Sequence, residues 1–152
     1  MSYQEQRSVV TMVSGVAIFF AMYLLAMPRF QALDPSVLGD GNQLLYWAAG
    51  MMLVFIAGSI VIRILVMILH AILYRIIAGE DPPSIEDERD KQIELKVSQI
   101  SQTIFILGFV AALIAVRGGA TAIGMLLWIA GAGLGAEIVG EVIRIIFYRR
   151  GF

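Results

Sequence analysis

The sequence predicts an all-α integral membrane protein with four transmembrane helices, arranged as two helical hairpins. Of the 152 residues, 59% are hydrophobic and 15% are charged, whereas a soluble domain is about half apolar and about a quarter charged. The apolar residues gather in long runs, which is typical of membrane-spanning helices. A partial internal repeat relates the two halves of the chain and predicts the pairing of the helices into hairpins.

Four apolar runs cover about residues 9–27, 44–78, 97–116 and 122–148. The first is about as long as a full span and longer than a signal-peptide core, so we expect it to be retained and to end at Pro28. The second has 35 residues, which at ~1.5 Å each exceed the ~30 Å core of a bilayer. We therefore expect the second span to tilt, to break or to run beyond the membrane, and the fourth to share a smaller excess.

The distribution of lysine and arginine predicts the orientation. Seven of these eleven residues lie on the side that carries both termini and the segment between the hairpins: Arg7, Arg75, Arg89, Lys91, Lys96, Arg149 and Arg150. Arg29 and Arg117 lie on the other side, and Arg63 and Arg144 are embedded. Because cytoplasmic loops carry the excess of positive charge, we expect both termini to be cytoplasmic.

Composition excludes several kinds of function. The net charge of −1 gives no general attraction to nucleic acid, and the chain has no cysteine and one histidine, His70. A thiolate or multi-histidine metal site within one chain is thereby excluded, and no cofactor is indicated. The sequence has no nucleophile–base motif and no glycine-rich phosphate loop, so we expect no enzyme activity.

The internal repeat aligns residues 46–64 with residues 127–145, which match at eight of 19 positions. The matches include Trp47 with Trp128 and Arg63 with Arg144. Apolar helices also resemble one another by composition, but two pairs of residues that are rare in spans favour duplication. We expect the tryptophans at the outer interface and the arginines at equal depth near the inner edge of the hydrocarbon.

Embedded charges gather on one face of the fourth span. Glu137, Glu141 and Arg144 are spaced by four and three residues, so they share a helix face. If this face meets the second span, Arg63 lies within reach of Glu141 and, by stretching outward, of Glu137. Arg144 is also placed to pair with Glu141 along its own helix.

Two interpretations of these charges remain open. One is a buried ion-pair cluster that locks helices or subunits together. The other is a proton or ion path that uses Glu137, with His70 further inward. The acids occur in only one half of the repeat, since Ile56 and Ile60 occupy the equivalent positions, and this favours the lock. A lone histidine on an apolar helix is more often a packing residue.

The opposite face of the fourth span carries three glycines, Gly124, Gly131 and Gly135. Small residues at such spacing allow two helices in a membrane to approach closely. We therefore expect the fourth span to pack tightly against another helix on this face and to form ion pairs on the opposite face.

The charged connector, residues 79–96, separates the first hairpin, residues 1–78, from the second, residues 97–152. Ser84 is the expected N-cap of one long helix that continues into the third span. The first turns of this helix are either a solvent-exposed extension with no binding role or a cytoplasmic docking surface. The residues of that surface are Glu86, Asp87, Glu88 and Arg89.

The same segment resembles a known pattern. Asp87-Glu88-Arg89, followed by Ile93 and Lys96, is similar to the D-E-R-x-x-x-I-x-x-K segment of small bacterial four-span membrane proteins, whose function is not established as a class. Val97 stands where that pattern often has alanine. The resemblance is confined to this segment and the start of the third span. It implies a prokaryotic inner-membrane protein and transfers no active site.

Two functions follow as hypotheses. The first is a non-catalytic accessory, regulatory or interaction subunit in the lipid bilayer, which forms a homo-oligomer or a larger membrane complex. The alternative is a small dimeric proton-coupled transporter or channel that uses Glu137, Glu141 and Arg63.

Overall fold

The computed structural model describes residues 3–79 and 87–150. These residues form five helices and no strand: α1 Tyr3–Gln31, α2 Pro35–Gly39, α3 Gly41–Ala78, α4 Glu88–Arg117 and α5 Ala122–Arg150. Four of them, α1, α3, α4 and α5, are long and apolar enough to cross a membrane. The prediction of an all-α chain with four such helices is confirmed.

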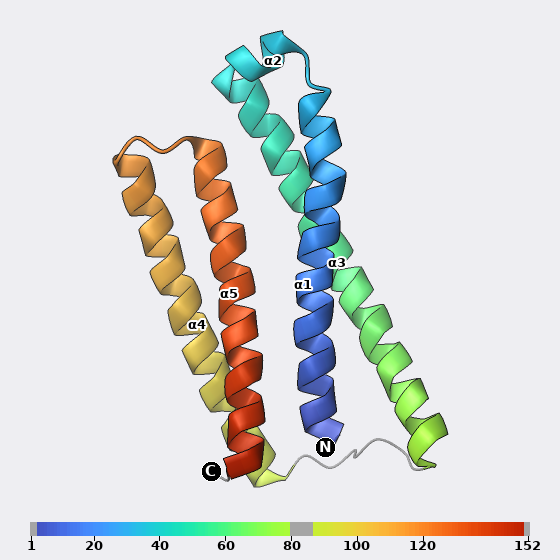
Figure 1. Ribbon diagram of the computed structural model, residues 1–152. Coiled ribbons are helices and arrows are strands. Elements are labelled where there is room, and N and C mark those ends of the chain that lie inside the picture. The colour runs from blue at the N-terminus through green and yellow to red at the C-terminus, as the bar shows by residue number, and fades with distance from the viewer. Residues whose placement is uncertain (1–2, 80–86, 151–152) are drawn as a thin grey trace.

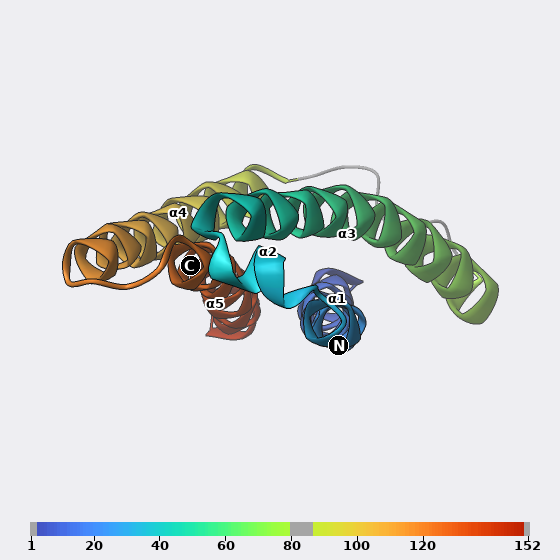
Figure 2. The same ribbon diagram turned by 90° about the horizontal axis from the view of Figure 1, so that it is seen from above.

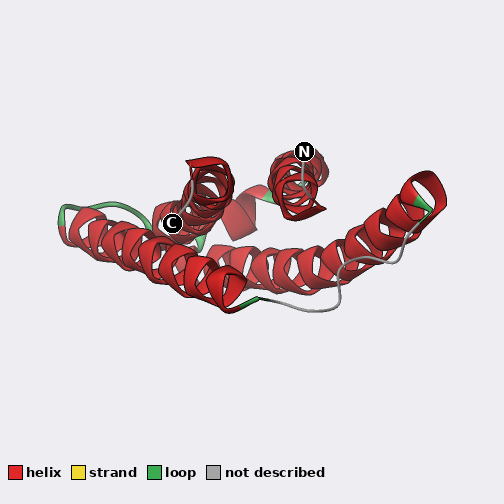
Figure 3. Cartoon of the chain, turned by 90° about the horizontal axis from the view of Figure 1, so that it is seen from below, coloured by secondary structure: helices red, strands yellow, loops and turns green. Residues whose placement is uncertain are grey.

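The four long helices run roughly side by side in two layers. In Figure 1, α5 lies between α4 and α1, and α3 crosses behind α1 and diverges from it toward the bottom of the view. Figures 2 and 3 show α3 and α4 in one layer and α1 and α5 in the other. We call the end with the start of α1 and the end of α5 the terminal end, and the end with α2 the loop end.

Few apolar side chains are buried within the chain. The described core consists of Ile18, Ile93, Val97, Ala112 and Ala136. Large apolar side chains cover the outer faces of all four long helices, and such a surface is unfavourable in water. It is consistent with a multi-pass membrane protein.

Pro28 does not end the first helix, contrary to the sequence prediction. α1 continues through Pro28 to Gln31, and the Ala32 N–H donates to the Pro28 carbonyl at 3.0 Å. A proline in a helix removes one backbone donor and crowds the preceding turn. Near the end of α1 this perturbs only the last turns, so the chain stays helical.

The second predicted span forms one unbroken helix, α3. Its 38 residues extend over ~57 Å at ~1.5 Å per residue, and the helix tilts across the bundle (Figure 1). The side chain of Asp40 caps its start by accepting from the N–H groups of Asn42 and Gln43. Gly79, with φ of 70°, ends it in the left-handed conformation that glycine adopts at low cost.

The cap at Asp40 depends on its charge. The backbone N–H of Asn42, with the side chain and N–H of Gln43, holds the pKa of the Asp40 carboxyl below its usual 3.8. The cap therefore stabilises α3 fully above pH 3.8 and is lost as the pH falls through the lowered pKa of the folded state.

The third span and the last part of the connector, residues 88–96, form one continuous helix, α4, as the sequence predicted. The helix starts at Glu88, and its N-cap is Asp87, whose side chain accepts from the Glu88 N–H at 2.7 Å. Ser84, the expected cap, lies outside the described residues.

Helices α4 and α5 pack closely at two glycines. A Cβ on Gly108 of α4 would lie 2.3 Å from the Cβ of Ala132, and a Cβ on Gly140 of α5 would lie 2.1 Å from the Oγ of Ser101. Neither distance leaves room for a side chain. The second hairpin is therefore held by small residues that let the backbones approach.

The glycines that the sequence marked for close helix contact make none with another helix of the chain. A Cβ on Gly131 or Gly135 would meet nothing within 4 Å, and one on Gly124 would meet only the preceding Ala120 and Thr121. Within the chain, the tight contact of α5 is on the face that carries Ala132 and Gly140. The prediction of close helix packing at Gly124, Gly131 and Gly135 is corrected accordingly.

Alanine substitutions should distinguish the two faces. We expect Gly108→Ala to destabilise the fold by about 1–3 kcal/mol, because the added methyl overpacks the α4–α5 contact. Gly131→Ala is the matched control, since its methyl enters open space and alanine favours a helix over glycine by up to ~1 kcal/mol. Unfolding of the purified protein in mixed micelles measures both. Equal stability of the two variants would contradict this packing.

Candidate functional site

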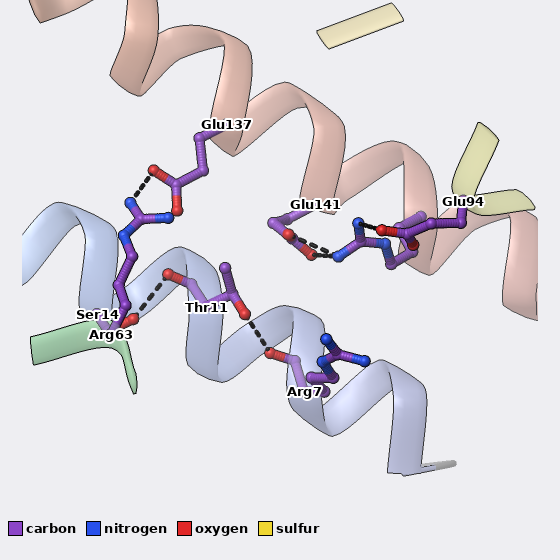
Figure 4. Close-up of polar contacts among 8 residues, drawn as sticks. Arg7, Thr11, Ser14, Arg63, Glu94, Glu137 and Glu141 are labelled. Atoms are coloured by element: carbon purple, nitrogen blue, oxygen red, sulfur yellow. Dashed lines mark hydrogen bonds and ion pairs between the residues drawn. The ribbon is translucent and has the colours of Figure 1, made fainter. Parts of the chain in front are cut away.

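The embedded charges meet where three helices converge. Arg63 of α3 donates a hydrogen bond to the Glu137 carboxylate of α5 and forms an ion pair with it. Figure 4 shows the Arg63 side chain extending from α3 to the carboxylate that projects from α5. This contact ties the first hairpin to the second.

The third helix of the site is α1. A Cβ on Gly15 would lie 3.0 Å from both carboxylate oxygens of Glu137, so the carboxylate packs directly against the α1 backbone. Gly15 is buried, and a side chain here would push the carboxylate away from α1 by a few tenths of an ångström. Both residues lie near the middle of their helices, since α1 runs from Tyr3 to Gln31 and α5 from Ala122 to Arg150.

The pair is not fully covered within one chain. The Arg63 side chain is 37% exposed and that of Glu137 is 17% exposed. One carboxylate oxygen, Oε1 of Glu137, is buried and has no hydrogen-bond partner among the described residues. A half-satisfied charge pair between apolar helix segments needs further polar contacts.

A second ion cluster lies toward the terminal end. The Arg144 guanidinium donates through Nη1 to both oxygens of Glu141 at 2.7 Å, and through Nη2 to Glu94 of α4 at 3.0 Å. Tyr148 lies near Asp90 of α4. This cluster therefore joins the two helices of the second hairpin.

The structure forms one of the two contacts that the sequence allowed for Arg63. The expected contact of Arg144 with Glu141 is present, but Arg63 binds Glu137 and not Glu141. Glu137 lies about two turns before Arg144, ~10 Å along the helix. The Arg63 guanidinium thus lies at the level of Glu137. The charged groups of Arg63 and Arg144 therefore lie at different depths, although the sequence predicted equal depths for these residues.

Polar residues of α1 were missed at the sequence level. Glu5 and Ser8 are buried, with 9% and 0% of their surfaces exposed. Arg149 of α5 approaches Glu5 at 3.6 Å. The steps from Glu5 to Ser8 and from Ser8 to Gly15 are close to one and two helical turns, which places all three on the face of α1 that meets α5. This spacing of small and polar residues in the sequence could have identified the face of α1 that meets α5.

His70 packs among aromatic rings and does not contact Glu137. Its ring stacks on Tyr3 with centroids 5.4 Å apart, and Tyr3 meets Tyr74 edge-on at 4.7 Å. His70 follows Arg63 on α3 by about two turns, toward the terminal end. This contact favours a packing role for His70.

The two tryptophans lie near the loop end in different surroundings. Trp47 packs against Phe30 of α1 with centroids 5.7 Å apart, whereas Trp128 is 55% exposed. Trp47 also borders an apolar cavity of about 180 Å³ between α1, α3 and α5, whose lining includes Phe19, Met22, Met51 and Phe55. The half of the bundle beyond Glu137 is therefore apolar where the hairpins meet.

The remaining predicted residues lie at the start of α4. Asp87, Glu88 and Arg89 are exposed, and Glu86 lies outside the described residues. Within residues 3–79 and 87–150, no group of three or more histidine, cysteine, aspartate or glutamate side chains is placed to hold a metal ion.

Comparison with protein-family models, curated proteins and solved structures finds no match to this chain. The geometry of the site therefore carries the functional argument.

Removing the charge of Glu137 should weaken the fold. We expect Glu137→Gln to lower the free energy of unfolding by about 1–3 kcal/mol, because the partly buried Arg63 loses its counterion. Glu88→Gln, on the exposed first turn of α4, serves as the control and should change stability little. If the two variants unfold alike in micelles, Glu137 is not a structural partner of Arg63.

Proposed function

We propose that this protein is a non-catalytic multi-pass membrane protein that acts as an accessory, regulatory or interaction subunit. The observation that carries the proposal is the Arg63–Glu137 pair, which joins α3 to α5 against α1 and leaves 37% of the Arg63 side chain uncovered. A charge at this position in a bilayer is costly unless protein or water covers it. The uncovered side of Arg63 thus supports association with another membrane helix.

The partner in this proposal is a second copy of the chain or a larger membrane complex. Arg63 has five N–H donors, and one of its nitrogens is engaged by Glu137. The remaining donors would contact acceptors of the associated helix. Around them, the exposed apolar face of α3, which includes Ile56, Ile60 and Ile64, offers a surface on which such a helix can pack.

The proposed location is a prokaryotic inner membrane, with the terminal end in the cytoplasm. The excess of basic residues on that side supports the orientation, and the D-E-R segment at Asp87–Arg89 supports the source. In this arrangement the exposed start of α4 is available on the cytoplasmic side for docking.

A duplication of the hairpin is part of the proposal. Helices α3 and α5 begin at positions 41 and 122, which fall in the same register as the sequence repeat. The first helices of the two hairpins begin at positions 3 and 88. These starts are slightly further apart in the sequence than those of α3 and α5, because the loop of the first hairpin, which contains α2, is the longer one. The matched starts of α3 and α5 support a common origin of the two hairpins.

A charge exchange tests the locking role of the pair. Arg63→Glu and Glu137→Arg should each destabilise the protein, because each places two like charges together. The double variant should recover part of the loss, since the opposite charges are again adjacent. Unfolding in micelles provides the measurement.

Glu141 offers a matched control for this exchange. Arg63→Glu combined with Glu141→Arg should show no recovery, because Glu141 binds Arg144 in its own helix. Recovery in this combination, and none with Glu137, would refute the assigned pairing.

The association is tested by counting chains. Protein labelled with one fluorophore per chain and diluted into lipid bilayers should bleach in more than one step, or should be isolated with another membrane protein. Single-step bleaching at every protein-to-lipid ratio, with no co-isolated membrane protein, would contradict the proposed function.

The second candidate is a small dimeric proton-coupled transporter or channel. The buried, unpartnered Oε1 of Glu137 favours it, because a carboxylate with a free acceptor can take up a proton. The charges available for such a path are Glu137, Glu141 and Arg63. The candidate requires a pH-dependent flux in liposomes that Glu137→Gln abolishes with the fold intact, and it fails if the wild-type protein shows no flux.

A further inference from the structure

We propose that the interface between α1 and α5 is a water-filled inlet that opens at the terminal end and stops at Glu137. The ligand is water, held as a short file between the two helices. The inlet gives Glu137 contact with the aqueous phase on one side of the membrane only. This inference is independent of whether the protein associates with a partner.

Buried polar atoms mark the course of the inlet. Ser8 Oγ on α1 and Glu137 Oε1 on α5 are buried without a hydrogen-bond partner among the described residues, and so is Nε of Arg144, whose guanidinium extends from α5 toward Glu94 of α4. Buried polar atoms in proteins are nearly always satisfied by protein or by ordered water. Three such atoms on these two helices therefore point to bound water.

The register of the two helices aligns these atoms. Gly15 lies opposite Glu137 and Glu5 opposite Arg149, so α1 and α5 run antiparallel. Ser8, between Glu5 and Gly15, then lies near the level of Arg144. The polar groups follow one another from the charged pair of Glu5 and Arg149 at the terminal end to Glu137 in the middle.

Side chains along this interface are suited to contact water. Glu141, 7% exposed, and Arg144 lie on α5 between the two ends, and Figure 4 shows the Glu141 carboxylate on the side of α5 that faces α1. On α1, Thr11 lies one turn before Gly15 and Ser14 directly precedes it in the sequence. Their hydroxyls donate to backbone carbonyls of the preceding turn, which leaves their oxygen lone pairs available as acceptors.

The inlet ends at Glu137 because the other half of the interface is apolar. Ile18 is buried on α1 immediately beyond Gly15, and the cavity further toward the loop end is lined by side chains such as Phe19, Met22 and Ala130. Apolar walls offer water no hydrogen-bond partners. Water therefore reaches Glu137 from the terminal end alone.

The chain has no cysteine, so single cysteines report water access without background. Silver ions, which are small and react with thiols, are applied in chloride-free buffer to sealed vesicles of known orientation. Thiols that remain are labelled with a maleimide dye after denaturation. Loss of labelling then measures access from the chosen side.

Two variants sample the inlet, and one matched control samples a dry contact. Ser8→Cys lies near the entrance of the inlet and Ser14→Cys near its end, beside Gly15. Val97→Cys is the matched control, because Val97 is 2% exposed, lies on α4 toward the same end, and packs against Gly140.

Three further variants complete the set. Met22→Cys samples the apolar half of the interface, where Met22 lines the cavity. Glu88→Cys and Leu38→Cys, which are exposed at the terminal end and the loop end, verify from which side the silver acts.

Silver on the terminal side should abolish labelling of Ser8→Cys and Ser14→Cys under conditions that leave Val97→Cys and Met22→Cys fully labelled. Silver on the loop side should leave all four labelled. If Ser8→Cys and Ser14→Cys are blocked no faster than Val97→Cys, the inlet does not exist. If Ser14→Cys is blocked equally from both sides, the inlet does not stop at Glu137, and the proposal is likewise overturned.

Discussion

The Glu137 carboxylate determines how the two hairpins meet. In a membrane, an apolar helix surface is as stable against lipid chains as against another apolar helix. Burial of apolar surface therefore does not favour one arrangement of four apolar helices over another. A specific arrangement then depends on polar contacts and on close backbone approach. Glu137 supplies both between the hairpins, because it binds Arg63 of α3 and packs on the bare backbone of Gly15 in α1. A charge at the centre of a membrane helix costs about 2.5–3.5 kcal/mol on insertion scales when nothing compensates it.

The two hairpins are built on different physical principles. The second is tight: Gly108 and Gly140 bring α4 and α5 together, and the Arg144–Glu94 bridge closes its terminal end. The first is open: α1 and α3 meet through edge-on rings such as Phe19 and Phe55, and α3 diverges toward the terminal end (Figure 1). The second hairpin thus forms a compact unit, while α3 is held by ring contacts with α1 and by the contact of Arg63 with α5. This difference places the uncovered charge on the helix with the least support from its own chain.

Hydropathy predicted the four long helices because a span needs about 20 apolar residues, a property of each segment alone. The contact of Arg144 with Glu141 was also predictable, since neighbours along a helix follow from its periodicity. The partner of Arg63 depends on the tilt of α3 across α5, which no local pattern encodes, so the sequence left both Glu141 and Glu137, one helical turn apart, within its reach. Helix α5 carries glycine or alanine on nearly every face. The spacing of small residues therefore did not reveal that α4 packs on the face of Gly140 and not on that of Gly131.

The claim that Glu137 holds the hairpins together is tested most directly by the distance between α3 and α5 in lipid. Spin labels on Ile77→Cys and Ile146→Cys, which are exposed on α3 and α5, report this distance by pulsed electron paramagnetic resonance. We expect a single narrow distance distribution with Glu137 present, and a broad or shifted one in Glu137→Leu, which removes the carboxylate but keeps a side chain of similar size. The same narrow distribution in both proteins would contradict the account.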